Sequence, residues 1–353
     1  MNRIVLMMLT VGLLGAACSS RSGSVPANST GPDSPVPPTQ PASASASPSV
    51  VAPDTIWPDP AKNGQIAFHR SLDSAQTTQA IFVINPDGTG ERRLTHPDPG
   101  VIDDQPDWSA DGAKIAFERC APAGCEAWTM NADGSGAKRI GPSEERSAPA
   151  WAPDGKVLAV NRAFGSVENN QIEFSQLVLV DSSTGRIIRR LDARSNFQGD
   201  TGGAGWAPDG TQVVFGRVNS STGSPPGAGA VFVVNADGTG LRRLTPWGLN
   251  GGDHPVWSPD GKLILFRAVS DEVYGNLYTI HPDGTGLHKL TGYDSTTMVL
   301  SCSFSPDGRW ITFAKSGVGG ESDVFVMRAD GSDIHPVTQT ALPDSAPDWG
   351  PAT

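Results

Sequence analysis

The sequence predicts an all-β protein: a six-bladed β-propeller closed by pairing of its N- and C-terminal strands, preceded by a signal peptide and a disordered linker. Two observations lead to this prediction. Two short phrases, W-S-P-D-G and N-x-D-G-T-G, alternate along most of the chain. The 353 residues also include 41 Gly and 30 Pro against 37% hydrophobic residues, a balance typical of many short strands joined by tight turns.

The N-terminal segment has the layout of an export signal. Arg3 precedes an apolar run, Ile4 to Leu14, that is too short to span a bilayer, and small residues then lead to Cys18. The arrangement resembles a bacterial lipoprotein signal, in which the cysteine is lipidated and becomes the new N-terminus. We therefore expect residues 1–18 to be a lipoprotein signal peptide with Cys18 lipidated. The alternative is an ordinary signal peptide cut near Ala17, which would leave Cys18 as a spare thiol.

Residues 19–60 form a tract rich in Ser, Pro and Ala with almost no large apolar side chains. Such a composition cannot bury a hydrophobic core, so we expect a disordered tether. The repeats follow it, and residues 61–353 are expected to form the propeller.

The first phrase reads P-x-W-[SA]-P-D-G-x-x-[IVL]-x-F and marks the first two strands of each blade. Its Asp-Gly pair between apolar runs is a hairpin signal, because Gly adopts a positive φ and the Asp side chain caps the turn. The aromatic positions are 43 to 55 residues apart, the length of a four-stranded blade with variable loops. They are Trp108, Trp151, Trp206, Trp257, Phe304 and Trp349.

The second phrase is a β-branched and aromatic run followed by N-x-D-G-T-G, a basic pair and Leu-Thr, and it marks the last two strands of each blade. The third copy is degenerate, with Asp181 to Gly185 in place of the Asp-Gly turn. The six copies are Ile81–Thr95, Trp128–Ile140, Leu177–Leu191, Val231–Thr245, Leu277–Thr291 and Val324–Thr338.

Two half-repeats at the ends of the repeat region predict how the ring closes. Gly64 to Phe68 matches the second strand of a blade, and Pro347 to Pro351 matches the first strand. Pairing the two would complete a sixth blade and leave no free sheet edge.

The two phrases together resemble the WD40-like repeat of the TolB propeller family over about residues 64–351. The resemblance is specific for the fold and only weakly specific for function. TolB itself carries an α/β domain ahead of its propeller, where this chain has a leader and a tether. We therefore expect the propeller alone and do not transfer the translocation role of TolB.

The charge balance limits the partners. A formal net charge of −11 and a pI near 4.9 argue against nucleic acid and against adsorption to anionic lipid, since both need a cationic face. We expect a monomer that contacts the membrane only through its lipid anchor. It would lie on the extracytoplasmic side of the cell membrane, periplasmic or at the cell surface.

The conspicuous Asp residues are interpreted as turn caps and not as calcium ligands, because a calcium site needs six to eight converging oxygens. The histidines lack metal-ligand spacing, and no G-x-S-x-G nucleophile elbow is present. We predict no metal, no cofactor and no catalysis. The capping residues are Asp87, Asp111, Asp133, Asp154, Asp209, Asp237, Asp260, Asp283, Asp307 and Asp330.

The residues just before each motif aromatic enter the innermost strand, which lines the channel mouth of a propeller. An acidic and polar ring there would suit a cation, an amine or a basic peptide. The alternative is that these residues satisfy backbone groups at the mouth. The candidates are Asp103, Asp104, Asp200, Asp253, His254 and Asp344.

These observations predict a noncatalytic module that binds an envelope protein or a small cationic or peptide ligand. The alternative is an envelope enzyme, carbohydrate-active or peptide-processing, with its site at the channel mouth. Cys120 and Cys125 bracket a short loop, and an exported protein meets oxidising conditions, so we expect a disulfide between them. Cys302 is expected to be a small buried apolar residue.

Overall fold

The computed structural model describes residues 57–141, 146–164, 174–191, 203–218, 228–269, 275–317 and 321–353. The chain divides into two compact units, Met1–Asp54 and Thr55–Thr353, and the first lies outside the described residues. The predicted signal peptide, Cys18 and nearly all of the tether therefore fall outside the description. Among the described residues, no helix has the length and apolar character needed to cross a membrane.

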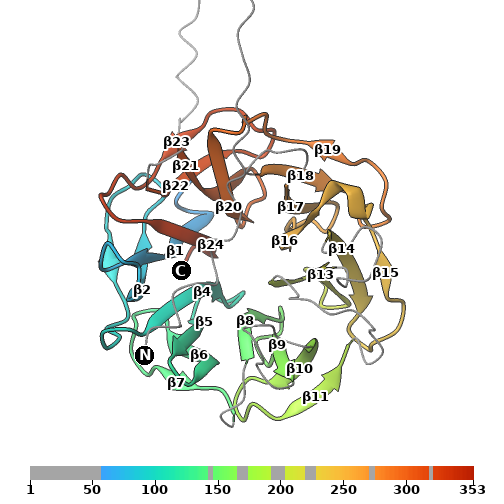
Figure 1. Ribbon diagram of the computed structural model, residues 1–353, viewed down its shortest axis with the longest axis horizontal. Helices are drawn as coiled ribbons and strands as arrows, with labels where there is room; N and C mark the ends of the chain where they lie inside the picture. The colour runs from blue at the N-terminus through green and yellow to red at the C-terminus, as the bar shows by residue number, and fades with distance from the viewer. Residues whose placement is uncertain are drawn as a thin grey trace, which may run out of the picture. The chain divides into compact units, whose positions relative to one another are not determined.

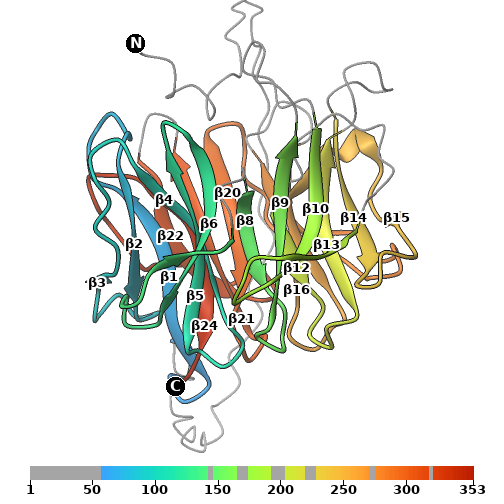
Figure 2. The same cartoon turned by 90° about the horizontal axis from the view of Figure 1, so that it is seen from below.

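The second unit is all-β, as predicted, and its one described helical element is the 3-10 turn η1 (Trp247–Leu249). Its strands form antiparallel meanders arranged around a common centre, with the architecture of a β-propeller (Figure 1). Figure 2 shows the same strands from the side, packed next to one another around the ring.

The described strands make up six four-stranded meanders. The innermost strands are β4 (Ile102–Trp108), β8 (Arg146–Trp151), β12 (Ala204–Trp206), β16 (Gly251–Trp257), β20 (Thr297–Phe304) and β24 (Asp344–Pro351). The second strands are, in the same order, β5 (Lys114–Ala121), β9 (Val157–Phe164), β13 (Gln212–Val218), β17 (Ile264–Ala268), β21 (Trp310–Gly317) and β1 (Asn63–Ser71).

The third strands are β6 (Gly124–Asn131), β10 (Phe174–Asp181), β14 (Gly229–Asn235), β18 (Asn276–Ile280), β22 (Asp323–Arg328) and β2 (Gln79–Ile84). The outermost strands are short: β7 (Lys138–Arg139), β11 (Ile187–Arg190), β15 (Arg242–Arg243), β19 (His288–Lys289), β23 (His335–Pro336) and β3 (Arg92–Arg93). The meanders that contain β2 and β4 are joined into one sheet by a single parallel pair, Gln79 with Ile102.

The hydrophobic core lies between neighbouring meanders. The last residue of the first phrase is fully buried in five meanders, where Phe68, Phe117, Phe215, Phe266 and Phe313 are all 0% exposed. Two of the third strands are buried on both faces, because every residue of β2 and of β18 is buried. Since a single sheet cannot cover two apolar faces, the meanders must stack against one another.

The turns follow the predicted chemistry. In all ten Asp-Gly turns the Asp Oδ1 accepts a hydrogen bond from the backbone N–H two residues later, as Asp237 does from Thr239 at 2.8 Å. These bonds stabilise the ionised carboxylate and lower the pKa of most of these groups, for Asp260 to about 2. The turn-cap interpretation is confirmed.

The first and last described strands pair with each other. β24 runs antiparallel to β1, with Trp349 opposite Ile66 and Asp344 opposite Arg70. Trp349 Nε1 donates to the Gly64 carbonyl oxygen at 3.0 Å. Each inner strand also contacts the next, from β4 through β8, β12, β16 and β20 to β24, and β24 contacts β4 again. The inner strands therefore surround the centre of the ring.

Candidate functional site

Most inner strands have an irregular pairing register just before the motif aromatic. The pairing register of β4 with β5 shifts between Asp104 and Asp107, and the same shift occurs in β8, β16 and β20. Such a shift is a β-bulge, which turns the strand and redirects its side chains. A proline follows directly in most copies and cannot donate to the sheet ladder, which favours the bulge at this point.

The residue at the bulge has a left-handed backbone in four meanders. Gln105, Ala148, His254 and Ala346 have φ values of 54°, 46°, 44° and 48°, and each precedes a proline. This conformation costs free energy for a residue with a Cβ atom, and the surrounding sheet must hold it in place. The bulge brings this residue and its successors to the centre of the ring.

A cavity of about 60 Å³ lies where the inner strands meet, and residues from all six meanders line it. That volume has room for a few water molecules or one small group. Its lining combines prolines and alanines with a few polar side chains. The polar lining residues are Gln105, Asp107, His254, Ser301 and Asp348.

Asp107 and Asp348 are the acidic residues of the lining. Asp107 Oδ2 accepts from the Trp151 backbone N–H at 2.6 Å, and Asp348 Oδ2 accepts from the Trp108 N–H at 2.8 Å. Ser303 Oγ donates to Asp348 Oδ1 at 2.7 Å. Each carboxylate is therefore anchored to the next inner strand around the ring.

No cationic side chain of the described part of the chain pairs with either carboxylate. Burial and the neighbouring Asp348 raise the pKa of Asp107 well above its usual value. Burial raises the pKa of Asp348 in the same way. Repulsion between the two negative charges therefore favours the protonated form of Asp107.

Gln105 and His254 meet across the cavity. They lie on β4 and β16, which belong to different meanders, and Gln105 Nε2 is 3.4 Å from His254 Nε2. The His254 imidazole also lies close to Gly203, the residue directly before β12. A Cβ atom on Gly203 would lie 3.2 Å from His254 Nδ1. Among the described members of the predicted acidic and polar ring, His254 lines the cavity.

The other described candidates lie off the cavity. Asp103 and Asp344 are 0% exposed, and each is bound by the guanidinium of a neighbouring strand. Arg119 Nε lies 2.5 Å from Asp103 Oδ1, and Arg70 Nε lies 2.6 Å from Asp344 Oδ1. The two carboxylates are thus neutralised inside the fold, although burial still raises the pKa of Asp344 against the opposing effect of Arg70.

Both arginines also stack on aromatic rings of their own sheets. The Arg70 guanidinium lies 4.8 Å from the centre of the Phe82 ring, and that of Arg119 lies 4.5 Å from the Trp128 ring. Hydrogen bonds from the Arg70 guanidinium to Asp344 and Glu91 outweigh the cost of its burial and raise the pKa of Arg70. These ion pairs are therefore fixed parts of the scaffold.

Asp104 is held by histidine. It is 6% exposed and contacts His69 Nδ1, and it also accepts from the Gln105 N–H at 2.5 Å. Burial opposes ionisation of this carboxyl, but attraction and hydrogen bonding from His69 outweigh it, so the pKa of Asp104 lies below its usual value. Asp200 and the side chain of Asp253 lie outside the described residues.

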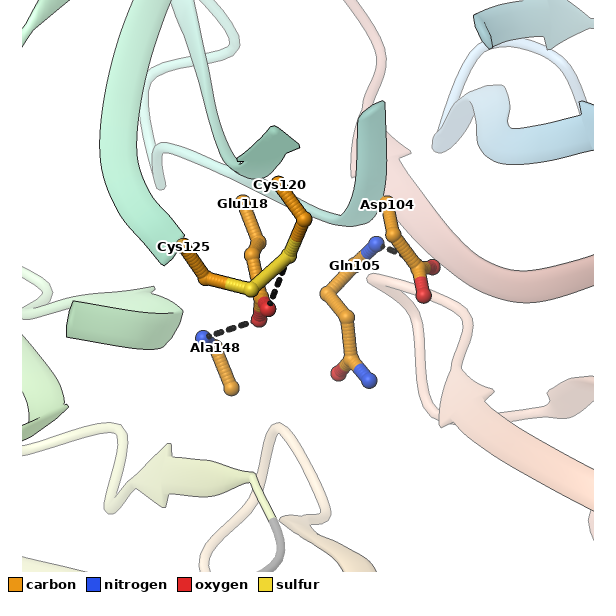
Figure 3. Close-up of a disulfide and its surroundings, with 6 residues drawn as sticks. All are labelled: Asp104, Gln105, Glu118, Cys120, Cys125 and Ala148. Atoms are coloured by element: carbon orange, nitrogen blue, oxygen red, sulfur yellow. Dashed lines mark hydrogen bonds between the residues drawn. A yellow bond between two sulfur atoms is a disulfide. The ribbon is translucent and has the colours of Figure 1, made fainter. Parts of the chain in front are cut away.

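The structure joins Cys120 and Cys125 by a disulfide across the hairpin of β5 and β6 (Figure 3). Glu118 lies beside it, with Oε1 2.8 Å from Cys120 Sγ, and its Oε2 accepts from the Ala148 N–H at 2.9 Å. These three side chains are close enough for a metal site, but disulfide sulfurs are not the thiolates that a metal binds. Cys302 is 3% exposed, as expected of a buried apolar residue.

The sequence reasoning missed the cavity-lining acids. A signal for the acids is present in the repeat: the x position of P-x-W is acidic only in two copies, Asp107 and Asp348. Other copies place Ala150, Gly205 and Val256 there. Because the ring joins β24 to β4, the two acidic copies are neighbours in space although 241 positions separate them in the sequence.

Comparison with known proteins supports the fold. No family model matches the chain. An uncharacterized protein of Agrobacterium fabrum is 28% identical over 205 residues, which cover 58% of this chain and 62% of that protein. The chain thus spans less than two thirds of that relative's length.

Solved structures agree on a TolB-like β-propeller. TolB from Acinetobacter baumannii has a TM-score of 0.63 and 20% identity, covering 84% of this chain and 68% of its own. A TolB candidate from Agrobacterium tumefaciens has a TM-score of 0.61 and 17% identity, covering 81% and 91%. Hydrazine synthase of Kuenenia stuttgartiensis has a TM-score of 0.67 and 16% identity, covering 83% and 47%. At these identities the likeness shows the fold alone.

Proposed function

We propose that this chain is a noncatalytic binding module displayed on the outside of the cell membrane as a lipoprotein. In this proposal it is a six-bladed propeller closed by its own N- and C-terminal strands. It binds an envelope protein or a small cationic or peptide ligand at the central cavity. TolB-like folds serve many functions, so the proposal rests on the site and not on the fold.

The observation that carries the proposal is the cavity itself. Residues of all six meanders converge there, and two carboxyl groups line it without a cationic partner in the described residues. Buried acids usually pair with a cation inside the fold, as Asp103 does with Arg119. Perturbed acids in a cavity are a recurrent mark of binding and active sites.

A capture experiment tests the binding function. The tagged full chain is expressed in its own cells, crosslinked and purified from the envelope, and its partners are compared with those of the Asp107→Asn/Asp348→Asn double variant. We expect a specific partner with the wild type that the double variant loses. Asp283→Asn, at an exposed turn, is the matched control and should keep it. Equal capture by all three proteins would refute a binding role for the cavity.

Ring closure has its own test. Gly64 faces β24 so closely that an added Cβ would lie 2.0 Å from the Pro351 carbonyl oxygen. Gly64→Ala should therefore lower the melting temperature far more than Gly248→Ala, since Gly248 has no atom within 4 Å of that position. Equal melting temperatures for the two variants would count against closure by these strands.

The anchor is tested by cell fractionation. Cys18→Ala should move the protein from the membrane fraction to a soluble fraction, because one lipidated cysteine supplies the expected attachment. Persistence of the variant in the membrane fraction would count against lipidation.

The enzyme alternative draws on the same carboxyl pair, because a carboxyl group with a raised pKa can act as a general acid. Its test is turnover of envelope glycans and peptides by the purified chain. Turnover that the Asp107→Asn/Asp348→Asn variant loses would replace the noncatalytic proposal with the enzymatic one.

A further inference from the structure

We infer that the central cavity binds a primary ammonium group carried on a short apolar stem, as in an alkylamine or a lysine side chain. The inference deepens the proposed function by naming the chemical class of the ligand, and it rests on that function. It follows from the charge of the cavity, from an unsatisfied hydroxyl in its lining, and from the apolar character of the remaining wall.

No Lys or Arg side chain of the described residues lines the cavity. Asp107 and Asp348 come from adjacent inner strands, and the hydrogen bonds that they accept come from neutral donors: two backbone N–H groups and the Ser303 hydroxyl. By contrast, Asp344 lies on the same strand as Asp348 and has Arg70 as its partner. A cation that enters the cavity would supply the missing charge.

A second, independent feature points to a ligand with N–H donors. Ser301 lines the same cavity and is 5% exposed, and its Oγ has no hydrogen-bond partner among the described residues. An unpartnered buried hydroxyl costs free energy, so native structures rarely keep one without a ligand or water. An ammonium group has three donors. The acceptors available to it are Ser301 Oγ, the Asp348 carboxylate and Asp107 Oδ1, which accepts no hydrogen bond within the described chain.

The rest of the wall suits an apolar stem. Prolines and alanines supply most of it, and prolines have no N–H with which to bind an anion or fix a water. Their apolar surface can cover methylene groups beside the charged end. The volume of about 60 Å³ limits the ligand to a slim group. The apolar lining residues are Pro106, Ala148, Pro149, Ala204, Pro255, Val256, Ala346 and Pro347.

The lining fits an ammonium group better than a divalent metal ion. Calcium takes six to eight oxygen ligands, and magnesium requires an octahedral set. In the described ranges, the sole group of three His, Cys, Asp or Glu side chains with ligand atoms within 4.8 Å is Glu118, Cys120 and Cys125. Neither cavity acid belongs to such a group. An ammonium group has three N–H donors, and it needs no acceptors beyond those already named in the cavity.

Binding should weaken as the pH falls, because the ammonium group competes with protons for the two carboxylates. The titratable side chains that line the cavity are Asp107 on β4, Asp348 on β24, His254 on β16 and Cys302 on β20. Asp104, bound to His69, lies beyond them, and attraction from His254 is among the effects that lower the pKa of Asp104. Within the described ranges, β8 and β12 contribute no titratable side chain to the lining.

The test is calorimetric titration of the full chain in detergent with n-butylammonium chloride. The uncharged isostere n-butanol and calcium chloride serve as the comparison ligands. We expect n-butylammonium to bind at least about tenfold more tightly than n-butanol. The Asp107→Asn/Asp348→Asn variant should lose this preference, Ser301→Ala should weaken binding, and Asp283→Asn should match the wild type. Equal binding of amine and alcohol, or calcium binding without amine binding, would overturn the inference.

The wild-type titrations alone decide the inference, so the test remains valid even if a variant fails to fold. They also separate it from the proposed function. Loss of partner capture in the double variant without any amine affinity would leave the binding function standing and remove the ammonium ligand. Amine affinity with unchanged capture would keep the ammonium site and remove the cavity from the binding function.

Discussion

Asp103 and Asp107 lie four residues apart on the same strand, yet the protein treats their charges in opposite ways. Asp103 is 0% exposed and paired with Arg119, which stacks on Trp128. Asp107 lines the cavity with a backbone N–H as its donor, and its pKa is raised by burial and by Asp348. The strand pair at the ring closure repeats the contrast, with Asp344 paired to Arg70 and Asp348 left without a cation.

The difference teaches which acids belong to the scaffold. An ion pair that is hydrogen-bonded and stacked is complete and has no charge left for a ligand. A carboxyl pair that lacks a cation reduces stability at neutral pH, and proteins retain such groups mainly where they serve a function. The scaffold acids and the cavity acids are the same residue type and lie at neighbouring positions of the same strands. Only the group that each carboxyl contacts distinguishes them.

The largest expected effect comes from breaking a scaffold pair. Arg70→Met should lower the free energy of unfolding by about 3–5 kcal/mol, because it leaves the Asp344 carboxylate buried without its partner. Urea unfolding of the purified chain measures the loss. The double variant Arg70→Met/Asp344→Asn should recover part of it. A loss below about 1 kcal/mol for the single variant would mean that pairing with arginine does not distinguish the scaffold acids from the cavity acids.

The next effect concerns the acid held by histidine. Asp104→Asn should cost about 1.5–3 kcal/mol near neutral pH, the range for a hydrogen bond to a charged group. The pKa of Asp104 is lowered, so its stabilisation is present above the usual carboxyl pKa and is lost as the pH falls through the folded value. Unfolding measured from pH 7 down to pH 3 should therefore show the variant and the wild type converging in acid. A difference in the free energy of unfolding that does not change with pH would contradict the assignment of this stabilisation to the ionised Asp104.

Replacing a cavity acid should have the opposite effect, raising the free energy of unfolding instead of lowering it. Asp107→Asn should raise the free energy of unfolding at pH 7 by about 0.5–2 kcal/mol, since removing a strained functional group commonly stabilises a protein. The Asn oxygen can still accept from Trp151, and the repulsion from Asp348 is gone. The raised pKa of Asp107 means that the wild type gains stability as the pH falls, so the advantage of the variant should vanish in acid. A variant less stable than the wild type at pH 7 would contradict the contrast between the two sets.

The sequence predicted the scaffold well and the site poorly, for a physical reason. The turn caps depend on contacts two residues apart, as between Asp237 and Thr239, so the local phrase contains all the information. The cavity depends on the bulge at Gln105, whose positive φ changes which side chains of β4 face the centre. Simple alternation along the strand places Asp104 there and misses Asp107. The Arg70 and Asp344 pair depends on the pairing of β1 with β24, which joins residues 274 positions apart.

The smallest expected effect tests an acid that is neither buried in a pair nor part of the cavity. Asp260 is exposed on a turn, where its Oδ1 accepts from Ser258 Oγ at 2.7 Å and from the Lys262 N–H at 3.1 Å. Asp260→Ala should cost about 0.5–1 kcal/mol, the net worth of a hydrogen bond that water can partly replace. Asp260→Asn keeps the Oδ1 acceptor and should cost less. These bonds lower the pKa of Asp260 to about 2, so its stabilisation is lost only as the pH falls below the usual carboxyl pKa toward 2. An Asp260→Ala loss as large as that of Arg70→Met would mean that burial and pairing do not rank these acids by their effect on stability. The distinction between scaffold pairs and cavity acids would then need another basis.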